Sequence, residues 1–203
     1  MRSLQFLSKP SRRLFWQVAV ALPLLTGCSS GGEGTDAVEA ANAQNQSKIS
    51  DEDVTAKQEA DAKFLVKVTG NALLEVELGK LMLARASSPI VRSYGTRVVQ
   101  ERLELLAALR TLAGAKKLAI PPALGEDEQA AYHEVNTRSG TQLDKQAVAL
   151  IVRTQKQDEE AFDKMKDDAY DGDIRGFAAK HLPAVEEQLA AADEVADDIE
   201  DMP

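Results

Sequence analysis

The sequence contains very little cysteine, tryptophan or histidine: one Cys, one Trp and two His among 203 residues. A single thiol cannot build an internal disulfide framework or a thiolate zinc site. Two histidines are too few for a histidine-rich metal site. With only 12 glycines and 7 prolines, the chain has few of the residues that interrupt helices. These absences favour long helices over many short strands.

Basic residues are also fewer than acidic ones: the sequence has 24 Lys and Arg and 33 Asp and Glu, which gives a formal net charge of −9. Without a net positive field to neutralise phosphates, we expect no binding to nucleic acid. The 44 % apolar and 28 % charged residues are typical of a globular chain. The length suits one domain with short additional segments.

The N-terminus carries a targeting signal. Four basic residues precede an apolar run of twelve residues, Leu14 to Leu25, which is shorter than the roughly 20 residues of a membrane span and typical of a signal peptide. The run ends in Leu25-Thr26-Gly27-Cys28, which resembles the bacterial lipobox, where the Cys is acylated and cleavage occurs just before it. This predicts a lipoprotein signal peptide over 1–27 and lipidation of Cys28. The alternative is an ordinary signal peptide with an incidental Cys, or an uncleaved anchor.

Processing would change the charge and fix the location. Residues 1–27 hold four basic and no acidic side chains, so the mature chain would carry 20 basic and 33 acidic residues, a net charge of −13. Ser29 and Ser30, rather than Asp, follow the Cys. By resemblance to lipoprotein sorting in bacteria with two membranes, this favours the outer membrane, with the protein facing the periplasm. Acyl chains such as palmitate gain about 0.8 kcal/mol per buried methylene, so lipid alone would anchor the chain.

The residues that follow the predicted acylation site are small, polar or acidic and offer little to bury. We therefore expect 28–50 to be a lipidated flexible tether. Ser50, followed by acids at 51–53, is typical of a helix start, with a capping hydroxyl and negative charge at the positive end of the dipole. The helical domain is thus expected over 51–203.

Apolar residues recur at three- and four-residue steps through this domain, which predicts helices. The predicted helices span 51–86, 89–117, 126–137, 141–170 and 174–199. The helix over 126–137 is a short extra one before the third long helix, and Thr141 with Asp144 has the spacing of a capping box. Four long amphipathic helices with short connections predict an all-α, antiparallel four-helix bundle.

Several short motifs agree in order and spacing with one family. They are Glu75-Val76-Glu77-Leu78-Gly79-Lys80, Ala86-Ser87-Ser88-Pro89-Ile90-Val91, Ile120-Pro121-Pro122, Gly140 with Asp144, Phe177-Ala178-Ala179-Lys180, and Leu182-Pro183. From Phe64 to Ala192 the chain resembles the bacterial envelope family called domain of unknown function 4142. The resemblance implies a ferritin-like helical bundle, often carrying a lipoprotein or secretory signal.

The chain departs from this family at three histidines. Where the family usually shows Asp-His in the second long helix, this sequence has Glu101-Arg102. A histidine of the third long helix is replaced by Gln155, and one in the last helix by Gln188. Of the positions that the resemblance marks for chemistry, only the acids Glu75 and Glu101 remain.

Four polar residues lie in the middle of otherwise apolar stripes, one on each long helix: Glu75, Glu101, Gln155 and Gln188. If the stripes face one another, these side chains meet in the core. Buried carboxylates need a cation, a shared proton or a hydrogen-bond donor such as Arg102. Two interpretations stay open: a degenerate carboxylate site for a divalent metal ion, or a buried polar network that fixes helix register. A di-iron bundle uses Glu-x-x-His motifs, and the sequence has none.

No nucleophile–His–acid spacing, phosphate-binding loop or dinucleotide fingerprint occurs in the sequence. We therefore expect no enzyme and no cofactor. The first hypothesis is a membrane-tethered, periplasm-facing helical-bundle lipoprotein that acts through an envelope protein partner or in stress tolerance. The alternative, from another class, is a ferritin-like metal-binding or redox protein that uses Glu75 and Glu101.

Overall fold

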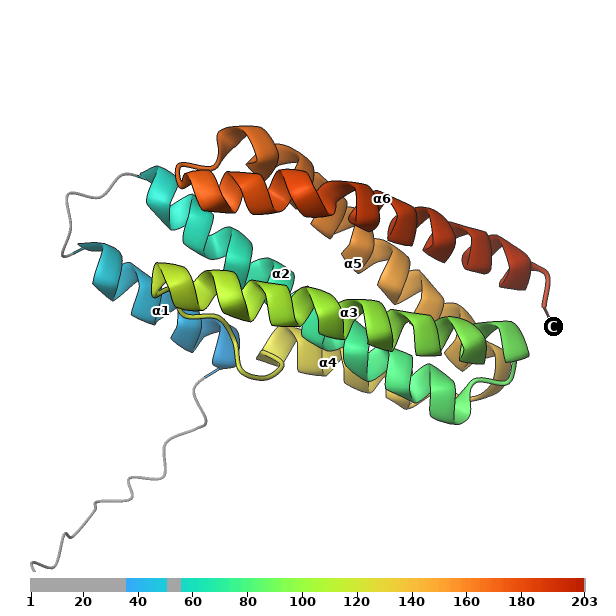
Figure 1. The fold of residues 1–203 in the computed structure, drawn as a ribbon. Helices are drawn as coiled ribbons and strands as arrows, with labels where there is room; N and C mark the ends of the chain where they lie inside the picture. The colour runs from blue at the N-terminus through green and yellow to red at the C-terminus, as the bar shows by residue number, and fades with distance from the viewer. Residues whose placement is uncertain (1–35, 51–55, 203) are drawn as a thin grey trace, which may run out of the picture. The chain divides into compact units, whose positions relative to one another are not determined.

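A computed structural model describes residues 36–50 and 56–202 as helices joined by short connections. The helices are α1 (Ala37–Ser50), α2 (Ala56–Arg85), α3 (Pro89–Lys116), α4 (Glu126–Asn136), α5 (Gly140–Asp168) and α6 (Gly172–Glu200) (Figure 1). Within these described ranges there is no strand, which confirms the all-α class. The predicted signal peptide and Cys28 lie outside the described residues.

The four long helices contact one another around a shared interior. Helix α2 packs against α3 and α5, α6 packs against α5, and α3 also contacts α6. Short turns connect α2 to α3 and α5 to α6, so each of these pairs forms a helical hairpin (Figure 1). The connection from α3 to α5 is longer and includes α4, which lies against α2 and α5. No helix in the described part of the chain combines the length and the apolar character needed to cross a membrane.

Local signals in the sequence account for the helix ends. At the start of α3 the Ser88 hydroxyl accepts a hydrogen bond from the Ile90 amide at 3.2 Å, and Pro89 follows the cap. Such a cap satisfies an amide that has no partner within the helix. Helix α6 begins with Asp171, whose carboxylate accepts from the Asp173 amide at 2.8 Å. These caps lie where the sequence predicted helix boundaries, within two residues.

The predicted capping box at the start of α5 is wrong. Asp144 is fully buried, and its carboxylate accepts hydrogen bonds from the Ser87 amide at 3.0 Å, the Ser87 hydroxyl at 2.6 Å and the Ser88 amide at 2.7 Å. It therefore joins α5 to the turn between α2 and α3. A charged acceptor with three donors is satisfied there, which makes its burial tolerable.

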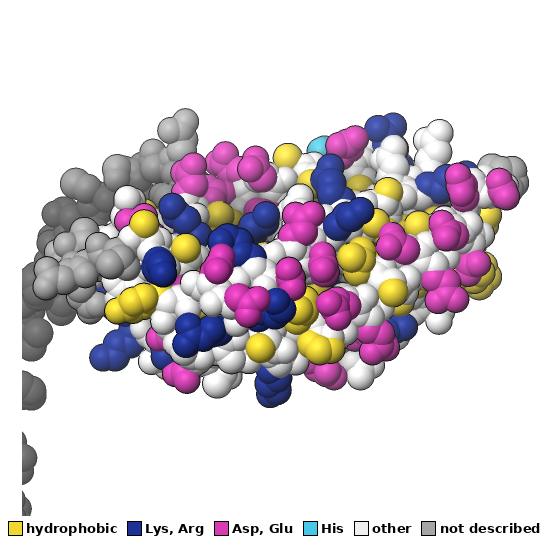
Figure 2. Space-filling model, turned by 90° about the horizontal axis from the view of Figure 1, so that it is seen from above, with side chains coloured by type: hydrophobic (Ala, Val, Ile, Leu, Met, Phe, Trp, Pro, Cys, Tyr) yellow, Lys and Arg dark blue, Asp and Glu magenta, His cyan; other side chains and the backbone are white. Residues whose placement is uncertain are grey.

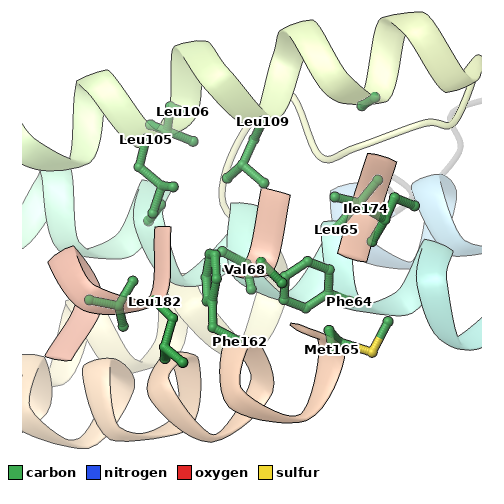
Figure 3. Close-up of a cluster of buried hydrophobic side chains, with 14 of the residues drawn as sticks. Phe64, Leu65, Val68, Leu105, Leu106, Leu109, Phe162, Met165, Ile174 and Leu182 are labelled. Carbon is green, nitrogen blue, oxygen red and sulfur yellow. The ribbon is translucent and has the colours of Figure 1, made fainter. Parts of the chain in front are cut away.

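One apolar core cluster is built from residues of all four long helices. Figure 3 shows Phe64, Leu65 and Val68 of α2 facing side chains of α3, α5 and α6. The rings of Phe64 and Phe162 meet edge to face, with centroids 5.1 Å apart, a geometry that aromatic pairs favour. A second apolar cluster lies around the turn between α2 and α3 and the ends of α5 and α6.

Helices α2 and α3 approach closely where two glycines face each other. A Cβ added at Gly79 would lie 2.7 Å from the Val99 Cγ2 and 2.9 Å from the Gly95 carbonyl oxygen. A Cβ at Gly95 would in turn lie 2.8 Å from the Gly79 carbonyl oxygen. Neither position has room for a larger side chain, so the two glycines set the separation of these helices.

Helix α1 differs from the flexible tether expected over 28–50. Its Ala41, Asn45 and Ile49 are buried, at four-residue steps that place them on one helix face. Asn45 also exchanges two hydrogen bonds with the Ala119 backbone, at 2.9 Å and 2.7 Å. Composition alone does not reveal this helix, because small and polar residues, together with one isoleucine, are enough to dock it on α2.

Candidate functional site

A buried carboxylate on α2, that of Glu75, lies at the centre of a polar network between α2, α3 and α5. Its side chain is fully buried. The Nε of Arg102 donates to Oε2 at 2.7 Å, and the Nε2 of Gln155 donates to the same oxygen at 3.0 Å. The Thr154 hydroxyl lies 2.8 Å from Oε1. Both oxygens of Glu75 are thus engaged by neighbouring donors.

A second carboxylate, that of Asp158, continues the network one turn further along α5. The Asn71 Nδ2 donates to Oδ1 of Asp158 at 2.7 Å. The other oxygen, Oδ2, lies 3.9 Å from Nη1 of Arg102, too far for a direct hydrogen bond. Asn71 precedes Glu75 by four residues and Asp158 follows Thr154 by four, so each pair shares a helix face.

The network holds more acidic than basic groups, because one guanidinium faces two carboxyl groups. Burial raises the pKa of Asp158 to about 7, with a further rise from the negative charge of Glu75 and an opposing effect from Arg102. Burial disfavours the charged form of Arg102, but the two carboxylates raise its pKa above the usual value. Glu75 and Arg102 therefore form the ion pair, and a proton on Asp158 gives the three side chains a net charge of zero.

The structure brings together two of the four site residues expected from the sequence, Glu75 and Gln155. Glu101 does not join them: its side chain is 25 % exposed and accepts from the Nε of Arg97 at 2.7 Å. The next residue, Arg102, points inward in its place. Gln188 of α6 is half-buried, and its Oε1 is buried without a hydrogen-bond partner among the described residues.

Arg102, predicted as a possible donor to buried carboxylates, makes that contact in the structure. The roles of Asn71, Thr154 and Asp158 were not predicted. Asn71 does share the inner stripe of its helix with Glu75, and Asp158 is the acid that follows Gln155 on the inner side of α5. A polar residue one turn from another on a buried face was the signal that could have found them.

The donor set does not fit a divalent metal ion. In the described ranges no three His, Cys, Asp or Glu side chains come close enough to hold one. The Arg102 cation lies against Glu75 and near Asp158, where it would repel a metal ion. His181 lies away from this network, with its ring 4.3 Å from that of Phe177, and burial lowers its pKa.

Comparison with known proteins gives one match. The model of a family described as "Domain of unknown function (DUF4142)" matches residues 40–195, which include all the helices from α2 to α5 and most of α6. The match begins inside α1. Neither the curated proteins nor the solved structures yield a match.

Proposed function

The chain belongs to the DUF4142 family, and on that premise we propose that it is a non-catalytic lipoprotein, anchored to the outer membrane through Cys28 and facing the periplasm. In this proposal the folded part is a ferritin-like four-helix bundle that acts by binding an envelope partner. The network around Glu75 has a structural role within it.

The bundle is supported by the contacts of the long helices. Helices α2, α3, α6 and α5 form a closed ring of neighbours, each touching the next. One long crossover, through 117–125 and α4, joins the two hairpins, and a single long crossover is also a feature of ferritin-like bundles.

The observation that carries the non-catalytic role is the contact of both Glu75 oxygens with protein groups, namely Arg102, Gln155 and Thr154. A carboxylate that serves as a base, a nucleophile or a metal ligand must present a lone pair to its reactant. Here both oxygens already contact protein groups, and the side chain is fully buried. The geometry is that of an ion pair that fixes the register of α2, α3 and α5.

Surface charge favours a partner other than nucleic acid. In Figure 2, basic and acidic side chains alternate over the visible face, with single hydrophobic residues between them. No continuous basic area gathers on that face to follow a phosphate backbone. Exposed apolar side chains such as Leu83 and Ile90, 50 % and 46 % exposed, border the turn between α2 and α3 and are candidates for contact with a protein.

The lipid anchor is tested by replacing its attachment site. We expect Cys28→Ser to abolish incorporation of a labelled fatty acid and to remove the protein from the outer-membrane fraction, because the hydroxyl is not acylated by this route. The matched control, Ser30→Ala, should keep both. Persistent labelling of Cys28→Ser would overturn the anchor.

The non-catalytic role is tested by elemental analysis of the purified full-length protein. We expect no stoichiometric iron, manganese or zinc. Bound metal that disappears in Glu75→Gln but persists in Glu77→Gln, a control on the exposed side of α2, would refute the structural role and support the metal-binding alternative.

A further inference from the structure

Six buried polar atoms have no hydrogen-bond partner among the described residues. They are the Tyr94 hydroxyl, Nη1 and Nη2 of Arg102, Oε1 of Gln155, Oδ2 of Asp158 and Oε1 of Gln188. Five of the six belong to residues of the network around Glu75 or next to it. Buried polar groups are nearly always paired with protein or with ordered water, so this concentration needs an explanation.

These atoms lack partners because the hydrogen bonds that their residues make use other atoms of the same side chains. Gln155 directs Nε2 toward the Glu75 carboxylate, which turns Oε1 away from it. Arg102 uses Nε for Glu75, so both Nη groups remain. Asp158 uses Oδ1 for Asn71, which leaves Oδ2. The Tyr94 hydroxyl adjoins Gln155 without meeting hydrogen-bond geometry.

The 3.9 Å between Nη1 of Arg102 and Oδ2 of Asp158 indicates a mediated contact. It exceeds a hydrogen bond, yet one molecule placed to the side of the line between the two atoms can bond to both. That molecule must accept from the guanidinium of Arg102, and it must donate to Oδ2 of Asp158 when this carboxyl is ionised.

The charge of the surroundings selects the occupant. A metal cation would be repelled by Arg102, and an anion would be repelled by Glu75, by Asp158 when ionised and by the carbonyl oxygen of Gln155. A neutral molecule that both donates and accepts satisfies every free atom. Water has that chemistry, and buried waters usually make two to four such bonds.

We infer that the core between α3 and α5 is a water-binding site, in which at least one ordered water bridges Arg102 to Asp158 and hydration extends to Tyr94 and Gln155. The water adds a hydrogen-bonded link to the 3.9 Å ion pair that joins α3 and α5 at this level. The inference goes beyond the proposed function, because it holds whether or not Cys28 is acylated.

Two measurements on the full-length protein test this site. A crystal structure that resolves ordered waters should show one within hydrogen-bonding distance of both Nη1 of Arg102 and Oδ2 of Asp158. In solution, oxygen-17 relaxation dispersion should reveal long-lived internal water. Its amplitude should fall in Tyr94→Phe, which removes one polar contact, and stay unchanged in Tyr132→Phe, a partly buried tyrosine of α4 outside the network.

Three outcomes would overturn the inference. The first is a direct hydrogen bond between the Arg102 guanidinium and Oδ2 of Asp158, with no water between them. The second is an anion at the position of the bridging water, recognised by anomalous scattering after bromide exchange. The third is a dispersion signal that is absent or that Tyr94→Phe leaves at the wild-type amplitude. The crystallographic arm needs no variant, so the site stays testable if a substitution destabilises the fold.

Discussion

Replacing Arg102 by methionine, a side chain of similar volume, should be among the single substitutions that destabilise the fold most. Arg102 is fully buried, and its Nε lies 2.7 Å from Oε2 of Glu75. Removing one member of a buried pair strands the other charge in a poorly solvating interior, at a cost of about 3–5 kcal/mol. Glu75 would keep its contacts with Gln155 and Thr154, so we expect the lower end, about 3 kcal/mol.

The assay is urea unfolding followed by far-ultraviolet circular dichroism, with Arg97→Met as the matched control. Arg97 makes an equally short contact, 2.7 Å, with Glu101, but the two side chains are 43 % and 25 % exposed. An exposed pair of this kind contributes about 0.2–1 kcal/mol. The comparison therefore holds the residue types and the distance constant and varies burial.

A double variant separates the ion pair from general packing. In Arg102→Met the stranded charge on Glu75 is the main penalty, so Glu75→Gln added to it should restore part of the stability instead of lowering it further. The loss in Arg102→Met should also grow from pH 5 to pH 8, because Arg102 lowers the pKa of the buried Asp158 carboxyl, which without that cation resists ionisation more strongly. A loss equal to that of Arg97→Met, or strict additivity with Glu75→Gln, would refute the buried ion pair.

Three further predictions concern stability. The pKa of Asp158 is raised to about 7 from its usual 3.8, so the folded state binds the proton more tightly than the unfolded chain, and this contribution to stability should be lost as pH rises from about 4 through 7. Asp158→Asn should flatten the dependence of unfolding free energy on pH over this range. An unchanged profile would contradict the raised pKa. Gly79→Ala should destabilise the protein by about 1–3 kcal/mol, because the added methyl group overpacks the contact between α2 and α3. The control Gly176→Ala, with nothing within 4 Å of its Cβ, should stabilise the protein by about 0.5–1 kcal/mol. Equal melting temperatures of the two variants would refute the close approach of α2 and α3. Asn45→Ala should cost about 1–3 kcal/mol, because it leaves the Ala119 backbone groups unpaired; unchanged stability would show that α1 does not depend on this contact.

Periodicity was enough to predict the long helices but not their exact rotation. After Val98, which is buried on α3, both Glu101 and Arg102 continue a helical stripe, at three and four residues. The two positions differ by about 100° around the axis. What decides between them is the partner: only the arginine gives the buried Glu75 a cation, while Glu101 pairs with Arg97 near the surface.

The other site residues depended on information that one helix does not contain. The spacing of Asp158 from Thr154 places it on the inner face of α5, but this spacing does not identify the partners that make its burial tolerable. It is buried because Asn71 and Arg102 lie opposite it on two different helices. The same limit explains α1, whose docking depends on the Ala119 backbone 74 residues away.

The motifs that identify the family are placed at contacts between helices. Gly79, in the first motif, meets Gly95 at the close crossing of α2 and α3. Ser87 and Ser88 of the second motif are bound by Asp144 of a third, which ties α5 to the turn between α2 and α3. At these motifs the contacts hold neighbouring helices together. Arg102 lies where the resemblance implies a histidine, and it neutralises the buried carboxylate of Glu75. Such an exchange would replace a possible metal ligand with an ion pair.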